Sequence, residues 1–171
     1  MPELITPTTR LYESWTESRD EWGHDEHPPG AGLRATDEVG TAAGFAAWVA
    51  RLRAAEVSVP DGWVRCSFRW IVEGDRYLGA IALRHELNDF LLDAGGHIGY
   101  GIRPSERKRG LATWALAEVL PLARELGLDR VLITCDDDNP ASARVIERHG
   151  GVLEDVRDTT LGIVRRYWIT L

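Results

Sequence analysis

A basic turn in the middle of the chain, from Arg107 to Thr113, has residue types that could bind a phosphate group. The strand-like segment before it ends at Pro104, and a helical pattern begins directly after Gly110. Backbone N–H groups at the start of a helix point outward and the helix dipole is positive there, so an anion binds well. Gly110 has no side chain and would let a diphosphate approach the backbone closely, and Ala112 keeps the next turn small. The residues of this turn therefore predict a phosphate site, to which Arg107, Lys108 and Arg109 would add positive charge.

The turn differs from the two common nucleotide-binding loops. It contains no G-x-x-x-x-G-K-[S/T] string, which excludes a P-loop. It also lacks the G-x-G-x-x-G of dinucleotide-binding folds. Taken alone, the turn fits a basic solvated loop before a core helix equally well, so the surrounding elements must decide.

Strand-like and helical segments alternate around this turn. Period-two or continuous apolar patterns predict strands, and glycine and proline mark their ends: Val64–Val72, Arg76–Arg84, His97–Arg103, Val131–Cys135, Gly151–Asp158 and Ile163–Thr170. Helical spacing predicts four helices: Thr8–Trp22, Thr41–Glu56, Leu111–Leu126 with a kink or break at Pro121, and one capped by Asn139 that ends at Gly150. This order predicts one α/β domain over residues 1–171. We expect a mixed sheet of about six to seven strands flanked by about four helices, with a parallel pair joined by the central helix.

Composition narrows the class of protein. A net charge of −7 and a pI near 5.2 argue against general affinity for nucleic acid, which relies on a basic surface. No apolar run approaches the roughly 20 residues of a membrane-spanning helix, and the N-terminus does not resemble a secretory signal, so we expect a cytoplasmic protein with no membrane partner. Cys66 and Cys135 lie in apolar stretches, where a thiol usually packs as a small hydrophobe. The segment from His24 to His27 lies in a Pro/Gly loop without helical pairing, so no metal site is predicted.

Two segments together resemble a known family. The turn from Arg107 to Ala112 is similar to the [Q/R]-x-x-G-x-[G/A] signature of the GNAT superfamily of N-acetyltransferases. The segment from Asn139 to Gly150 resembles the second element of that superfamily, N-x-x-[A/S]-x-x-[V/L]-x-x-x-x-G. The resemblance covers roughly Trp63 to the C-terminus, and the order of the elements agrees throughout. More narrowly, the chain resembles a poorly characterised bacterial subgroup of predicted acetyltransferases.

The resemblance implies a GNAT-like fold and acetyl-coenzyme A as co-substrate. In that superfamily the amides of the turn hold the pyrophosphate, and the preceding strand, here Gly99 to Arg103, offers backbone groups to the pantetheine arm. The acetyl group then passes to an amine by direct attack in a ternary complex, without an acyl-enzyme. Carried over to this sequence, the residues expected to bind the cofactor are Ile102, Arg103, Arg107, Lys108, Arg109, Gly110, Leu111, Ala112, Thr113, Asn139 and Ser142.

The sequence leaves several candidates for the catalytic residues. Many superfamily members place a tyrosine in the second motif to protonate the departing thiol, and the matching position here is Ile146. Ser142 or water could act instead, although Ser142 also suits a capping role at its helix start. His97 is a candidate base because imidazole titrates in the right range, with a buried, hydrogen-bonded histidine as the alternative. Tyr100 is a comparable candidate if the opposite face of the strand is the active one.

We therefore expect an acetyl-coenzyme A-dependent N-acetyltransferase acting on a small-molecule or peptide amine. A non-catalytic coenzyme A sensor and an acyltransferase with a longer acyl donor are the alternatives. Trp15 and Trp22 could form an aromatic wall for the acceptor, although core packing or a homodimer contact explains them as well. The other five tryptophans, Trp63 among them, lie in segments expected to form the core.

Overall fold

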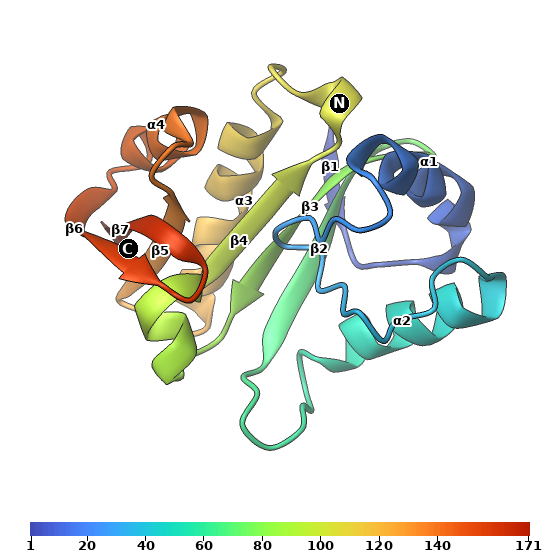
Figure 1. Ribbon diagram of the computed structural model, residues 1–171, viewed down its shortest axis with the longest axis horizontal. Helices are drawn as coiled ribbons and strands as arrows, with labels where there is room; N and C mark the ends of the chain where they lie inside the picture. Colours follow the sequence, from blue (N-terminus) through green and yellow to red (C-terminus); the bar gives the residue numbers. More distant parts are fainter.

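The computed structural model describes residues 1–171 and contains a single seven-stranded sheet with the strand order β1-β2-β3-β4-β5-β7-β6 (Figure 1). The strands are β1 (Glu3–Ile5), β2 (Cys66–Glu73), β3 (Arg76–Arg84), β4 (Ile98–Ile102), β5 (Arg130–Asp136), β6 (Val152–Thr159) and β7 (Gly162–Thr170). The α-helices are α1 (Tyr12–Trp22), α2 (Ala42–Ala54), α3 (Leu111–Glu125) and α4 (Pro140–Arg148). Short 3₁₀ turns lie at Thr9–Leu11 (η1) and Pro104–Glu106 (η3), and a π-helical turn lies at Leu91–Gly95 (η2).

One pair of neighbouring strands differs from the rest. β4 and β5 run parallel, joined by α3, whereas every other neighbouring pair is antiparallel. Their pairing consists of one bridge, between Ile98 and Ile133. Beyond Ile98 the two strands separate, so β4 has an open edge on that side, toward the turn that begins α3.

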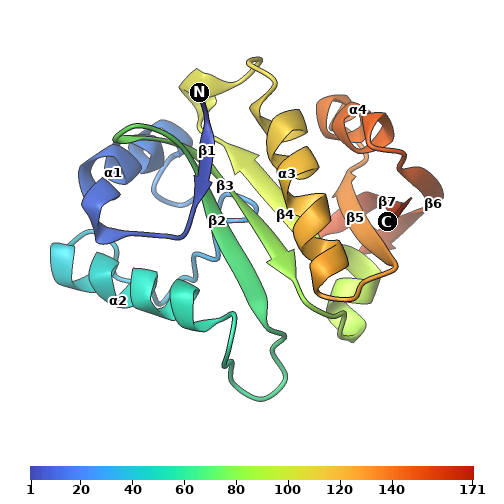
Figure 2. The ribbon, with the colours of Figure 1, turned by 180° about the vertical axis from the view of Figure 1, so that it is seen from behind.

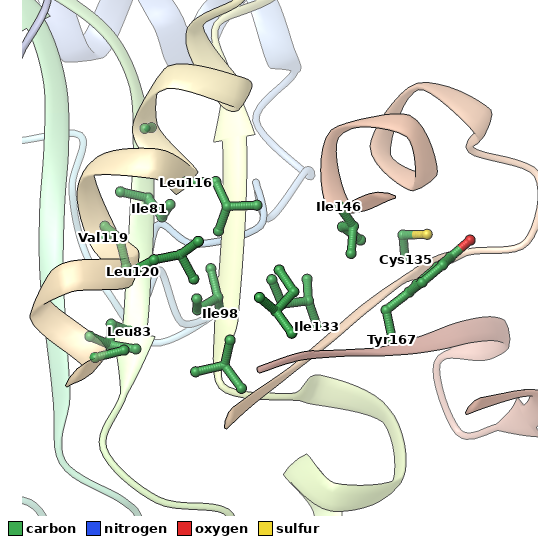
Figure 3. Packing of buried hydrophobic residues seen from close by; sticks show 14 of the residues in the cluster. Ile81, Leu83, Ile98, Leu116, Val119, Leu120, Ile133, Cys135, Ile146 and Tyr167 are labelled. Carbon is green, nitrogen blue, oxygen red and sulfur yellow. The ribbon is translucent and has the colours of Figure 1, made fainter. Parts of the chain in front are cut away.

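The helices cover the two faces of the sheet. α3 and α4 pack on one face, where Figure 2 shows α3 crossing β4, and α1 and α2 lie on the other. The α3/α4 face holds the larger apolar core, in which α3 contributes Leu116, Val119 and Leu120, and α4 contributes Ile146 (Figure 3). A stripe of apolar residues at helical spacing faces the sheet in each case, which is why these segments form helices here.

The α1/α2 face is held by aromatic side chains. Trp15, Phe45, Trp48 and Trp70 are buried, with ring centroids 4.8–6.0 Å apart. Trp63 does not join them. It is 56% exposed, because β2 begins three residues later at Cys66, and the guanidinium of Arg34 stacks 4.0 Å from its ring centroid. The expectation that Trp63 packs in the core is therefore wrong.

The sheet and helices predicted from the sequence are confirmed, with element ends shifted by a few residues. β1 and η2 were not predicted. β1 is only three residues long and pairs with β2 at the edge of the sheet. α3 runs through Pro121 without a break, and this residue is exposed, so its ring lies on the solvent side of the helix.

Candidate functional site

The turn between β4 and α3 presents a run of unpaired backbone donors. The N–H groups of Lys108, Arg109, Gly110, Leu111, Ala112 and Thr113 donate no hydrogen bond within the protein. Lys108 and Gly110 both have positive φ, 66° and 75°, so the chain curls around this run. Successive N–H groups in such a curl at a helix start form a concave site for an anion.

Open space lies in front of this turn. A Cβ added to Gly110 would meet no atom within 4 Å, so an incoming group can reach the backbone there. Arg107 and Lys108 are exposed beside it. The Arg107 guanidinium lies 4.7 Å from the ring centroid of Trp22, and its Nε donates to the Ile102 carbonyl at 3.4 Å. The turn therefore combines backbone donors with two cations that have no carboxylate partner.

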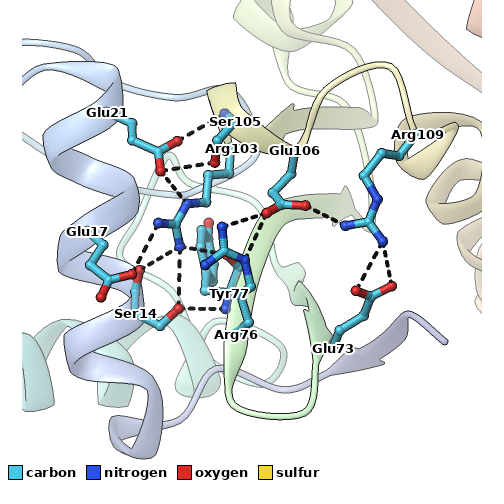
Figure 4. Close-up of polar contacts among 10 residues, drawn as sticks. All are labelled: Ser14, Glu17, Glu21, Glu73, Arg76, Tyr77, Arg103, Ser105, Glu106 and Arg109. Atoms are coloured by element: carbon cyan, nitrogen blue, oxygen red, sulfur yellow. Dashed lines mark hydrogen bonds and ion pairs between the residues drawn. The ribbon is translucent and has the colours of Figure 1, made fainter.

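Arg109 differs from its two neighbours. Its Nη2 donates to both carboxylate oxygens of Glu73, at 2.9 and 3.0 Å, and its Nη1 donates to Glu106 (Figure 4). Glu106 is 8% exposed and also accepts from Arg76 Nε at 2.8 Å. Burial acts to raise the pKa of Glu106, but the hydrogen bonds from Arg76 and Arg109 outweigh it and hold the pKa below its usual range. The charge of Arg109 is thus matched by carboxylates, and its side chain ties the turn to the β2–β3 hairpin.

Arg103 anchors the other end of the turn to α1. Its side chain is buried, with Nε donating to Glu21 at 2.7 Å and Nη2 donating to Glu17 at 3.1 Å (Figure 4). Glu21 also accepts from the backbone N–H of Ser105 at 3.0 Å. The backbone N–H of Arg103 donates to Leu78 in β3 at 2.8 Å. Both the guanidinium and the amide of Arg103 are therefore engaged within the protein.

The open edge of β4 has its own backbone donors and acceptors. The Arg103 N–H bonds to β3, and hydrogen bonding in an antiparallel ladder alternates along the strand. The N–H and C=O groups of Tyr100 and Ile102 therefore point away from β3, toward the side where β5 has separated. An extended ligand could pair with these groups like an added strand.

The structure brings together two of the sequence-predicted catalytic candidates. The Tyr100 hydroxyl lies 2.6 Å from Ser142 Oγ. Burial raises the pKa of Tyr100 to about 12, so this phenol stays protonated at neutral pH. The Ser142 backbone N–H donates to Asn139 Oδ1 at 3.1 Å, which is the helix cap predicted for Asn139. Ile146 is fully buried in the core and offers no polar group.

His97 lies apart from this pair. It is 4% exposed, and its Nδ1 accepts a hydrogen bond from the Leu132 N–H at 2.9 Å. Burial, and then the charges of Arg84 and Arg130, lower the pKa of His97 to about 4. The imidazole is therefore neutral near pH 7 and links the start of β4 to β5. This is the buried, hydrogen-bonded histidine considered above as the alternative to a catalytic base.

The remaining candidates take structural positions. Trp15 is buried in the aromatic cluster, and Trp22 supports Arg107. Cys66 and Cys135 are free, buried thiols. His24 bonds Asp20 at 2.6 Å, and no group of three or more metal-ligating side chains occurs. No helix combines the length and the apolar character needed to cross a bilayer.

The hydrogen-bond network around Arg103 and Glu106 was not predicted from the sequence. Glu17 and Glu21 are four residues apart on one helix face, so two carboxylates there could have indicated an arginine clamp. Which arginine fills it could not be read from the sequence, because the partners lie more than eighty residues apart.

Comparison with known proteins identifies the family and the fold of this chain. The model of the GNAT acetyltransferase domain matches residues 10–152. No curated protein sequence is significantly similar to the chain. Among solved structures, Mycobacterium smegmatis RimJ in complex with a coenzyme A disulfide has a TM-score of 0.74 at 20% identity, covering 99% of this chain and 81% of that chain. RimL in complex with coenzyme A has a TM-score of 0.71 at 17% identity, covering 99% of this chain and 94% of that chain.

A third similar structure is an acetyltransferase from Salmonella typhimurium that modifies the N-terminal serine of a 50S ribosomal subunit protein. Its TM-score is 0.68 at 17% identity, with 99% of this chain and 95% of that chain covered. At such identities these likenesses establish the fold, whereas the domain match extends over most of the sequence and establishes the family. The chain belongs to the GNAT acetyltransferase family.

Proposed function

We propose that this protein transfers the acetyl group of acetyl-coenzyme A to a primary amine by direct attack in a ternary complex. The observation that carries the proposal is the run of unpaired N–H groups from Lys108 to Thr113, curled beside the exposed cations Arg107 and Lys108. A diphosphate carries negative charge and several acceptor oxygens, which is what this turn is able to bind.

The rest of the co-substrate would follow the open edge of β4. In this proposal the pantetheine arm pairs with the backbone groups of Tyr100 and Ile102, which have no strand beside them. The thioester then lies near the place where β4 and β5 separate. Ser142, in the first turn of α4, is bonded to Tyr100 there, and Asn139 caps the same helix.

The chemistry requires few groups from the protein. A neutral amine attacks the thioester carbonyl, the C–S bond breaks as the sulfur takes up a proton, and the attacking nitrogen loses a proton to water. Holding the two reactants together supplies much of the rate enhancement. We assign Ser142 Oγ as the donor that passes a proton to the leaving sulfur and takes one back from water, with the protonated Tyr100 hydroxyl bonded to it at 2.6 Å. His97 receives no chemical role, because the residue is 4% exposed and its Nδ1 already accepts a hydrogen bond from the Leu132 N–H.

The acceptor is proposed as a small molecule or the amino terminus of a peptide. One structurally similar acetyltransferase, at 17% identity, modifies the N-terminal serine of a ribosomal subunit protein, which makes peptide amino termini the first acceptors to test.

The test is release of free thiol from acetyl-coenzyme A in the presence of a panel of amines and peptides, with acetylated product confirmed by mass. Thiol release that depends on an acceptor supports the proposal. Tight binding of acetyl-coenzyme A with no transfer across the panel would favour a coenzyme A sensor instead. Propionyl- and butyryl-coenzyme A run in parallel would show a preference for a longer acyl donor.

A further inference from the structure

Arg84, on the α1/α2 face of the sheet, has no carboxylate partner. Arg84 ends β3, and its Nη1 donates to the carbonyl oxygens of Gly95 and Gly96 at 3.0 and 3.1 Å. Its Nε and Nη2 donate to no protein group, and neither is enclosed. Burial lowers the pKa of Arg84, and the only group that opposes this effect is the Cys66 thiol.

The two arginines that are almost fully buried, Arg103 and Arg166, are matched by acids. Arg103 is bonded to Glu17 and Glu21, and Arg166 is bonded to Glu154 and Asp155. Removing a guanidinium from water without an opposite charge is costly, and carbonyl oxygens compensate only in part. A bound anion would therefore balance the positive charge of an arginine that is partly enclosed and has no acidic partner.

The Arg84 guanidinium lies close to the proposed acetyl site. A Cβ built on Gly99 of β4 would lie 3.8 Å from Arg84 Nη1, so the guanidinium stands over the strand on the α1/α2 face. Gly99 directly follows Ile98, where β4 and β5 make their one bridge before separating. The backbone of Gly30 approaches the same place, with its N atom 3.4 Å from that Cβ position. The charge thus lies beside the point where the thioester would end.

We propose that Arg84 binds a carboxylate of the acceptor, so that the preferred substrates are amines carrying a carboxylate near the reacting nitrogen. This inference rests on the proposed function. The free Nε and Nη2 can donate two parallel hydrogen bonds to one carboxylate, the geometry that suits a guanidinium best. The carboxylate comes either from a free amino acid or from an acidic residue near the amino terminus of a peptide.

The test compares matched acceptor pairs: an amino acid with its amide, and a peptide with aspartate at its second position with the same peptide carrying asparagine. The intact protein should prefer the acid member in kcat/KM by about ten- to a hundredfold, since a hydrogen-bonded charge pair contributes that much discrimination. In Arg84→Gln the preference should be lost, mainly through KM. The amine pKa differs within each pair, and comparing the ratio between protein variants cancels that difference. Preference within the amino acid pair alone, or within the peptide pair alone, identifies the source of the carboxylate.

Two controls make the outcome decisive. Arg65→Gln removes the same charge from an exposed site directly before the first residue of the neighbouring strand β2 and should leave the ratio unchanged. Arg84→Lys keeps the charge, so it should retain part of the preference if Arg84→Gln folds poorly. An intact protein that shows no preference within either pair overturns the inference, as does an equal fall of kcat for both members in Arg84→Gln.

A failure of the proposed function would look different. If no acceptor is acetylated, direct binding of the acid and amide members to the coenzyme A-loaded protein still tests Arg84. Tighter binding of the acid member that depends on Arg84 would support the inference, and equal binding would contradict it.

Discussion

The hydroxyl of Tyr100 in β4 lies 2.6 Å from the Oγ of Ser142 in α4, so one hydrogen bond spans the region where β4 and β5 separate. Tyr100 reaches this place because the even-numbered residues of β4 face the α3/α4 side, where Ile98 packs in the core. The superfamily's usual tyrosine position is Ile146, which is buried here. The Tyr100–Ser142 pair thus supplies hydroxyl groups from two other positions.

Ser142→Ala should lower kcat about ten- to a hundredfold, because it removes the proposed proton donor to the leaving sulfur. Asn139 still caps α4 in this variant, so folding and coenzyme A affinity should change little. Steady-state kinetics together with calorimetric titration of coenzyme A measure both quantities. Tyr100→Phe keeps the serine and should have the smaller effect. An unchanged kcat in Ser142→Ala would remove Ser142 from the chemistry.

Gly110→Asp should weaken coenzyme A binding by more than about tenfold, because the new carboxylate would occupy the space in front of the free amides and repel the diphosphate. Gly127→Asp is the matched control. Gly127 also has positive φ, 85°, and open space around its Cβ position, but it lies at the far end of α3. Both variants bear similar backbone strain, so equal losses of affinity would mean that strain, and not the phosphate site, is responsible.

Arg107→Gln should reduce coenzyme A affinity more than Arg109→Gln. The Arg107 guanidinium is exposed beside the turn, whereas the charge of Arg109 is matched by Glu73 and Glu106. Affinity measured at several salt concentrations should also depend less on salt in Arg107→Gln than in the intact protein. The opposite ranking would show that Arg109 leaves its carboxylates when the ligand binds.

His97 should make stability depend on pH between about 4 and 6.5. The unfolded chain binds a proton on His97 below its ordinary pKa of about 6.5, whereas the folded protein does so only below about 4. The unfolded state therefore binds more protons in this window, and stability falls as the pH is lowered through it, by on the order of 2 to 3 kcal/mol in total. Above pH 6.5 the contribution of this group is constant.

His97→Asn tests that assignment, because its amide oxygen can still accept from the Leu132 N–H. Denaturant unfolding across this pH range should show a shallower dependence in the variant than in the intact protein. Its kcat near neutral pH should remain close to that of the intact protein. A large loss of kcat with unchanged coenzyme A affinity would instead make His97 the base.

Much of the fold could be predicted because its local patterns are strong. The capping residues Thr41 and Asn139 and the apolar stripes of α3 and α4 locate the helices, and the predicted strands lie close to the observed ones. β1 was missed because three residues at a sheet edge carry almost no period-two signal. Trp63 was misplaced because a period-two pattern does not show at which residue a strand begins beside a loop.

The site was predictable only where it is local in sequence. The turn from Arg107 to Thr113 could be recognised because a helix start and a glycine are adjacent in the chain. The engagement of Arg109 by Glu73, and of Arg103 by Glu17 and Glu21, depends on contacts between distant segments. The same holds for the meeting of Tyr100 with Ser142, which alternation along β4 permits but does not require.

A crystal structure with bound coenzyme A measures the central claim most directly. We predict pyrophosphate oxygens within about 3.2 Å of several amide nitrogens between Lys108 and Thr113, with the pantetheine arm paired to the open edge of β4. A pyrophosphate bound elsewhere, with those amides bonded only to water, would contradict the proposed site and the reaction built upon it.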